Sequence, residues 1–335
     1  MKFHRYSIVH LILLAFLLVT RQISHSETAE GIDPRALPFA RSFGEAQRLV
    51  GLTKIIEERY PVLSAEAKDT RLNFEQGDLG QSVHALENQL KAMTGTKWVD
   101  LKTGVDQSVR NLQSLPLTEE AASFKLREIR DRTNRRKFDA ITAGLLAAHP
   151  KYAASISAEF RDRWIQIFDS KDNPRAKGID FTISFPGSWI LLDPIKPTTV
   201  QSFQNIAGAG PITAALIVRE LPQIKTFTEE QLSNYVDQQV KAGMLSPATK
   251  VVTIKKMFLD TCPAIYIDVE NEGQQLDKTF KMRSSEFQMF YKGHKITIGF
   301  SFIPDTVTHS TADEFQAKYF EQYKAIANTF SINRH

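Results

Sequence analysis

The stretch that decides the fold runs from residue 251 to residue 303, VVTIKKMFLDTCPAIYIDVENEGQQLDKTFKMRSSEFQMFYKGHKITIGFSFI. Apolar and polar residues alternate along most of it, as Ile296, Ile298 and Phe300 do with Thr297 and Gly299. A period of two is typical of a β-strand with one apolar face. The stretch therefore predicts a meander of three or four antiparallel strands, because strands joined by short links pair with their neighbours in the chain.

Short polar segments divide this meander into strands. Residues 260–261 and 271–273 predict two turns, and residues 291–295 predict a hairpin turn that contains a glycine. The alternation slips by one position near Ser284 and Ser285. One extra residue there would bring both halves of the strand onto the same face, so we expect a β-bulge.

Further strands and helices are expected around the meander. Residues 181–185 and 212–218 alternate as strands do, and residues 199–206 predict an edge strand. Residues 228–231 and 311–314 have the form of capping boxes, which indicate the starts of two helices. This half of the chain therefore combines antiparallel strands with two helices.

The first half of the chain has a different periodicity. Its apolar residues recur at intervals of three and four, which is typical of helices, and Pro61, Gly77 and Gly95 mark breaks between them. A helix over residues 118–148 and a last helix over residues 151–168 are predicted. Nothing repeats at intervals of 30 to 50 residues, so the pattern does not indicate a helical repeat protein.

The periodicity changes at residues 170–178, which are rich in turn-forming residues. They offer nothing apolar to bury, so we expect an exposed linker with few contacts. The sequence thus predicts an α+β protein with a helical domain at residues 39–169. An antiparallel sheet with helices packed on it is predicted at residues 178–333.

The N-terminus has the pattern of an export signal. A basic start precedes an apolar run over residues 8–19, and small residues at positions 24 and 26 suit a cleavage site. We predict a signal peptide at residues 1–26 and a disordered leader at residues 27–38, with an uncleaved anchor as the alternative. The protein is therefore expected to be exported, to the periplasm or the extracellular space.

Composition narrows the class of protein further. The 335 residues include 42 basic and 38 acidic ones, and cleavage of the signal peptide would reduce the net charge from +4 to +1. This balance is unlike that of a nucleic-acid-binding protein. Cys262 is the only cysteine, so the chain can form neither an intrachain disulfide nor a cysteine-based metal cluster.

The second half resembles the PsbP-like α/β/α sandwich group, which includes the extrinsic photosystem II subunit and the bacterial DcrB-like envelope proteins. Four segments carry the resemblance: residues 181–189, 260–264, 291–295 and 327–330. The resemblance covers about residues 178–332 and implies an antiparallel sheet with helices on both faces. It also implies binding or assembly more often than catalysis, and it assigns no functional residue here.

The side chains that could carry chemistry lack the spacing that chemistry needs. Those considered are Cys262, His84, His149, His294, Glu57, Glu58 and the loop at residues 208–211. The histidines do not fall on one helical turn, adjacent glutamates point about 100° apart on a helix, and the loop lacks a third glycine. We therefore predict no catalytic, cofactor-binding or metal-binding residue and no cofactor.

A basic segment from Lys125 to Lys137 holds seven basic residues and two acidic ones. The simpler interpretation is an exposed helix with internal pairs such as Glu128 with Arg132. The alternative is a docking site for an acidic protein or an anionic membrane surface.

Two functions remain open at this point. The first is a non-enzymatic envelope protein that acts as a binding or assembly module with a protein partner. The alternative is a hydrolase or other enzyme whose site lies in the cleft between the two halves. A pocket where histidine, carboxylate or serine side chains converge would favour the enzyme.

Overall fold

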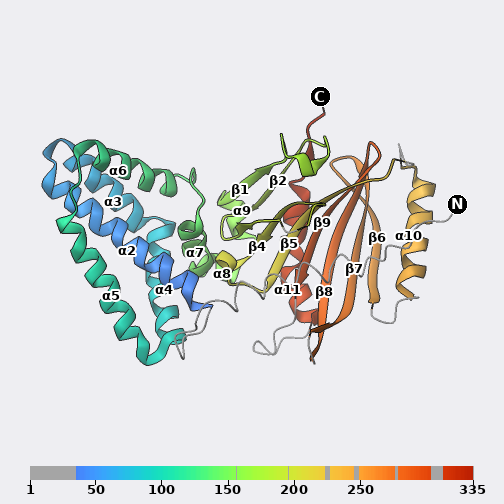
Figure 1. The fold of residues 1–335 in the computed structure, drawn as a ribbon, viewed down its shortest axis with the longest axis horizontal. Helices are drawn as coiled ribbons and strands as arrows, with labels where there is room; N and C mark the ends of the chain where they lie inside the picture. Colours follow the sequence, from blue (N-terminus) through green and yellow to red (C-terminus); the bar gives the residue numbers. More distant parts are fainter. Residues whose placement is uncertain are drawn as a thin grey trace.

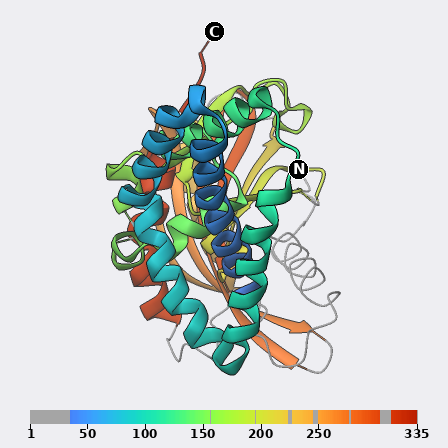
Figure 2. The same cartoon turned by 90° about the vertical axis from the view of Figure 1, so that its left-hand side faces the viewer.

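The computed structural model shows an elongated protein with a helical region at one end and β-sheets at the other (Figure 1). Figure 2 shows the helical region in front of the sheets. The structure describes residues 35–155, 157–194, 196–222, 227–244, 249–275, 278–302 and 312–334. The expected signal peptide, the leader up to residue 34 and the capping position at Thr311 lie outside these residues.

Five long helices and three short ones form the helical region. They are α2 (Ala36–Arg59), α3 (Ser64–Gln76), α4 (Asp78–Thr94), α5 (Trp98–Asn111), α6 (Glu119–Thr133), α7 (Ala140–Ala148), α8 (Pro150–Ala154) and α9 (Ala158–Arg161). The breaks fall at Pro61, Gly77 and Gly95, as predicted. Gly95 has a φ of +53°, a conformation that favours glycine. The Thr118 side chain caps α6 by accepting a hydrogen bond from the Ala121 N–H.

Two predictions for the helical region are wrong. The helix expected over residues 118–148 is broken, because α6 ends at Thr133 and the Asp139 side chain caps a new helix by accepting from the Thr142 N–H at 3.0 Å. The expected leader also extends too far, because residues 36–38 lie in α2 and Ala36 is fully buried.

The helix expected over residues 151–168 is also wrong. The chain forms α8 and α9 there and then the strand β1 (Ile165–Asp169), which pairs with β2 (Phe181–Pro186). The segment 170–178 is not free of contacts either. Ala176 is buried in the core beside the sheets, and the Arg175 guanidinium donates to the backbone oxygen of Pro194 at 3.0 Å. The two-domain division stays a prediction, but β1 belongs with the sheets.

The strands form two antiparallel sheets, which confirms the α+β class and the strands predicted from alternation. The small sheet has the order β1-β2-β10 and the large sheet the order β3-β4-β5-β9-β8-β7-β6. The other strands are β3 (Ile190–Leu192), β4 (Thr199–Gln204), β5 (Ile212–Glu220), β6 (Thr249–Leu259), β7 (Cys262–Gln275), β8 (Lys278–Tyr291), β9 (His294–Phe302) and β10 (Ser331–Ile332). The expected edge strand β4 is an inner strand, because β3 pairs with it.

The meander differs from its prediction in two places. Strand β7 continues through the expected turn at residues 271–273, and β8 pairs with β7 and β9 without a register shift at Ser284 and Ser285. Both serines are buried, and the Ser284 hydroxyl lies 3.2 Å from that of Ser301. The apparent slip in the alternation arises because polar side chains occupy interior positions, so no bulge is needed.

Helices cover both faces of the large sheet. On one face, α11 (Ala312–Asn328) and the small sheet enclose a core rich in aromatic rings, where Phe300 stacks on Tyr323 with ring centroids 4.3 Å apart. On the other face, α10 (Glu229–Met244) packs against β6 and β7, with Leu232 in a cluster with Ile265. Thr228 and Gln231 exchange two hydrogen bonds before α10, as the predicted capping box requires.

Candidate functional site

The junction between the helical region and the sheets is where the alternative hypothesis places an enzyme site. The turn after β2 lies against the helical region. A Cβ on Gly187 would come within 2.7 Å of side-chain atoms of Leu146 and Phe138. Ile206 from the large-sheet side packs into the core of the helical region. The two halves are therefore in direct, close contact at this turn.

A buried carboxylate in α9 holds the turn. Glu159 accepts hydrogen bonds from the Ser188 N–H at 2.9 Å and from the Ser188 hydroxyl at 2.7 Å, and both residues are buried. Burial raises the pKa of Glu159 to about 7, although the hydrogen bonds from Ser188 and the Gly187 N–H oppose the rise. Both carboxylate oxygens accept hydrogen bonds from Ser188, so this pair joins α9 to the turn after β2.

A second polar cluster ties α4 to the start of β1. The Asp78 carboxylate accepts from the Trp164 indole N–H at 2.6 Å and from the Tyr152 hydroxyl at 3.1 Å. The Tyr152 hydroxyl also donates to Asp162 at 3.0 Å, and burial raises the pKa of Tyr152. The Arg135 guanidinium lies 5.0 Å from the Trp164 ring centroid. These groups bind one another across the junction and fix how the helices meet the sheet.

The side chains considered from the sequence lie far apart in the fold. Cys262 is buried at the start of β7, and burial raises the pKa of its thiol. His149 caps α8 by accepting from the Lys151 N–H, His84 lies in α4, and His294 starts β9. Glu57 binds Arg71 at 2.9 Å. None of these residues joins another in a shared site.

Among the described residues, no group of three or more histidine, cysteine, aspartate or glutamate residues is placed to hold a metal ion. The loop at residues 208–211 follows a short 3-10 helix (Ile206–Gly208), and a long helix does not follow it. The fold thus brings none of these candidates together with a phosphate-binding or metal-binding geometry.

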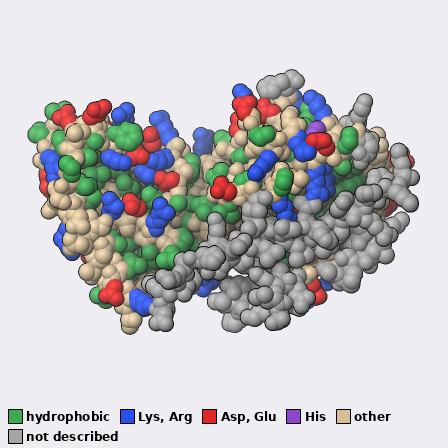
Figure 3. Space-filling model, viewed as in Figure 1, with side chains coloured by type: hydrophobic (Ala, Val, Ile, Leu, Met, Phe, Trp, Pro, Cys, Tyr) green, Lys and Arg blue, Asp and Glu red, His purple; other side chains and the backbone are tan. Residues whose placement is uncertain are grey.

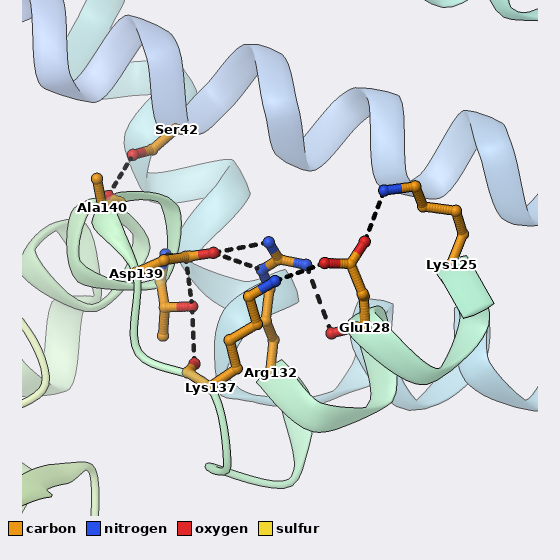
Figure 4. A network of polar contacts seen from close by, with 8 residues as sticks. Ser42, Lys125, Glu128, Arg132, Lys137, Asp139 and Ala140 are labelled. Carbon is orange, nitrogen blue, oxygen red and sulfur yellow. Dashed lines mark hydrogen bonds and ion pairs between the residues drawn. The ribbon is translucent and has the colours of Figure 1, made fainter. Parts of the chain in front are cut away.

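The basic segment 125–137 is compensated by nearby acids (Figure 4). Five of its seven basic residues form ion pairs: Lys125, Arg130, Arg132, Arg135 and Lys137. The predicted partner of Arg132 is wrong, because Arg132 binds Asp139 at 2.6 Å while Glu128 binds Lys125 and Lys137. These two lysines lower the pKa of Glu128 to about 2. The segment therefore has most of its charges paired, as the simpler interpretation expects, but Arg130, Arg132 and Arg135 pair with acids outside the segment.

Figure 1 shows the links α2–α3 and α5–α6 at the end of the helical region that is farthest from the sheets, and three exposed apolar residues belong to these links and to the first half of α6. Val62 is 80% exposed, Phe124 53% and Leu115 43%. We call these three residues the helical tip. Leu63 and Ala122 share one small core cluster, whereas the neighbouring Val62 and Phe124 face away from it. The sequence did not reveal the tip, since which apolar residues stay exposed depends on how the helices pack.

Over the helical region, basic and acidic side chains lie among hydrophobic ones (Figure 3). The Lys125 ammonium lies 5.6 Å and the Arg127 guanidinium 6.0 Å from the Phe124 ring centroid. A groove of about 450 Å³ lies nearby between α3 and α6. It is lined by polar residues: Glu66, Asp69, Thr70, Asn73, Arg130, Thr133 and Asn134. An ion pair between Arg130 and Glu66 joins the two helices there, so the groove carries mixed charge.

Comparison with solved structures finds proteins similar to the second half of the chain. Cyanobacterial PsbP from Synechocystis sp. PCC 6803 is 16% identical, with a TM-score of 0.32 over 50% of this chain and 92% of that one. LpqN, involved in cell envelope biogenesis of Mycobacterium tuberculosis, is 13% identical, with a TM-score of 0.33 over 53% and 97%. The Ran-binding protein Mog1p of Saccharomyces cerevisiae is 11% identical, with a TM-score of 0.33 over 50% and 96%.

The resemblance to the PsbP-like group is thus confirmed for about half of the chain. At such TM-scores the likeness says nothing about function, and the fold class follows from the strand order itself. No family model matches the chain, and no curated protein matches its sequence. Within the described residues, every helix is too short or too polar to span a bilayer.

Proposed function

We propose that this protein is an exported, non-enzymatic module of the cell envelope that binds a protein partner through the helical tip. The observation that carries the proposal is the exposure of Val62, Leu115 and Phe124 at the far end of the helical region. Burying such side chains in a complex contributes roughly 25 cal/mol per Å² of apolar surface. Exposed aromatic residues ringed by charged ones are typical of protein interfaces.

A protein partner fits this surface better than an anionic membrane. Membrane surfaces attract unpaired clusters of basic residues. The basic segment beside the tip holds its charges in ion pairs, and Glu128 alone binds two of its lysines. Lys125 and Arg127 also lie close to the Phe124 ring. A partner with an apolar pocket and a mixed polar rim suits this arrangement.

Export is part of the proposal because of the basic start and apolar run at residues 8–19. Intact-mass analysis of the protein recovered from its host tests it. We expect the mature form to lack residues 1–26. A mature form that keeps its first residues would refute cleavage and favour the anchor.

The tip is tested with the variant Val62→Glu/Phe124→Glu and the matched control Val99→Glu. Val99 is an exposed valine at the start of α5, so its substitution places one glutamate, as each of the two tip substitutions does, at an exposed apolar site away from the tip. We expect the wild type and V99E to migrate in native gels of envelope extract as a complex larger than the 37.9 kDa chain. The tip variant should migrate as the free protein.

Three results would contradict the proposal. The wild type migrates only as the free chain, the tip variant keeps the complex, or the V99E control loses the complex as fully as the tip variant does. A thermal melt of each variant serves as the folding control. The substitutions lie at exposed positions and should leave the melting temperature nearly unchanged.

A further inference from the structure

The strand β6 (Thr249–Leu259) is the last strand of the large sheet, and no other described strand pairs with its outer edge. An outer strand presents a row of backbone N–H and C=O groups that another strand can bind. A register shift between Val251 and Thr253 interrupts the first part of β6. The residues from Thr253 to Leu259 pair with β7 without interruption, so this part of the edge is regular.

The regular part of β6 carries an exposed aromatic residue as well as the lysines that usually prevent one sheet edge from pairing with another. The side chain of Phe258 is 71% exposed, whereas that of the next residue, Leu259, is buried. Lys255 and Lys256 are exposed and adjacent, so they point to opposite faces of the sheet. Lys256 donates to the Ser233 hydroxyl of α10 at 2.9 Å, which places it on the face that α10 covers. Lys255 therefore lies on the other face, with Met257.

We propose that residues 253–259 of β6 bind an extended, acidic segment of a partner protein, which adds a strand to the large sheet. The backbone of the added strand would bond to the free edge of β6. Its acidic side chains would lie beside Lys255 and Lys256 on the two faces, and an apolar side chain would cover Phe258. This is a second binding surface, separate from the helical tip.

The charges on β6 argue for a partner protein over a second copy of this chain. Two copies paired edge to edge would bring the lysines of one β6 close to those of the other, and like charges on paired strands destabilise the pairing. Lysine on an edge strand is itself a device that discourages self-pairing. If the lysines served only to prevent edge-to-edge pairing, Phe258 would not need to be exposed. An exposed phenylalanine beside two lysines suits an edge that binds an acidic strand with an apolar side chain.

The test uses the full chain and a fluorescein-labelled peptide with two adjacent glutamates flanked by valine and threonine. Binding is followed by fluorescence anisotropy, with a second peptide that has lysines in place of the glutamates. We expect saturable binding of the glutamate peptide only. The variant Lys255→Glu/Lys256→Glu should weaken that binding at least ten-fold and gain binding of the lysine peptide. That gain also shows that the variant is folded.

Two N-methylated glutamate peptides separate strand addition from simple charge attraction. One carries methyl groups on the amides of one set of alternate residues, which leaves one edge able to pair with β6, and the other carries them on every amide, which leaves no such edge. We expect one to bind and the other to lose binding. The proposal is overturned if the glutamate peptide does not bind, or if both methylated peptides or the lysine peptide bind equally well. It is also overturned if the wild type forms a dimer that Phe258→Asp abolishes.

Discussion

The helical region and the sheet region differ in how far apart in the sequence the residues lie that stabilise each of them. In the helical region, ion pairs within one helix, such as Arg71 with Glu75, add to ion pairs between helices, such as Arg130 with Glu66. In the sheets, rings from distant segments meet, as Phe181 does with Phe330 at a centroid separation of 5.2 Å. The individual helices can therefore form from local signals, whereas the sheets require segments far apart in the chain to be brought together.

The largest effect expected from this difference concerns where the sheet region begins. We expect a fragment of residues 162–335 to unfold cooperatively and to be more stable than residues 178–335 by roughly 5 kcal/mol. The shorter fragment lacks β1, which pairs with β2, and lacks Phe168, whose ring lies 6.1 Å from that of Phe203. Losing a packed phenylalanine alone costs about 3–5 kcal/mol.

Urea denaturation of the two fragments measures this difference. Equal stability would show that β1 contributes little and that residues 170–178 are a true boundary. Failure of both fragments to unfold cooperatively would show that the helical region and the sheets share one core, and the two-domain division would be wrong.

A substitution in the aromatic core should cost more stability than one on the opposite face of the same strand. We expect Phe300→Ala to lower the free energy of unfolding by about 3–5 kcal/mol, the usual range for an emptied aromatic site. Phe300 is fully buried and stacks on Tyr323, while its ring meets Phe287 edge-on. Thr297→Ala, on the opposite face of β9, should cost far less. Urea melts with equal losses for the two variants would show that the faces are assigned wrongly.

The junction between the two regions should respond to pH. The pKa of Glu159 in the folded protein, about 7, lies above its ordinary value of 4.5. The folded state therefore keeps a proton that the unfolded state releases, so stability falls as pH rises from 4.5 to 7. A shift of this size corresponds to about 3 kcal/mol at most.

Thermal melts of the wild type and of Glu159→Gln across that range test the junction. The glutamine can still accept from the Ser188 N–H but cannot lose a proton, so its stability should change less with pH. An exposed carboxyl on β1 serves as the control, and Asp169→Asn should keep the slope of the wild type. If wild type and E159Q show the same slope, Glu159 does not titrate as its burial implies.

The fold was predictable where the signal lies within a few residues. Alternation in the meander and in the strand ending at Phe185 located the strands, and the Thr228 capping box located α10. Strand β1 was missed because its five residues sit in a helical context and become a strand only by pairing with β2. The buried serines of β8 led to the wrong prediction of a bulge, because polar residues were expected outside the core. Their hydroxyls form hydrogen bonds inside the fold.

The candidate surfaces were less predictable than the fold. Glu159 and Ser188 meet only after the halves dock, so no local spacing could have announced them. Phe258 alternates as an interior residue does, and its exposure depends on what covers the end of β6. Val62 and Phe124 likewise become a surface only when α2, α3 and α6 have packed. Exposure is a property of the assembled fold, and a single sequence does not encode it locally.

The smallest effect expected concerns the edge of the large sheet. We expect Lys255→Thr/Lys256→Thr to increase self-association of the protein by about 1 kcal/mol. The substitution removes like charges that oppose edge pairing and introduces threonine, which favours strands. Sedimentation velocity over a range of protein concentrations measures the association. The control Lys171→Thr/Lys318→Thr makes the same change of charge at exposed positions outside β6 and should leave the protein as the wild type.

Measurements at high salt separate the effect of lysine charge on self-association from the effect of the threonine side chains. In about 1 M salt, where the Debye length is about 3 Å, the lysines of the wild type are screened and its self-association should approach that of the β6 variant. If the control associates as strongly as the β6 variant, the effect is one of net charge and not of the strand edge. If neither variant associates more than the wild type at any salt concentration, the lysines do not protect this edge. Their role would then lie only in binding an acidic partner.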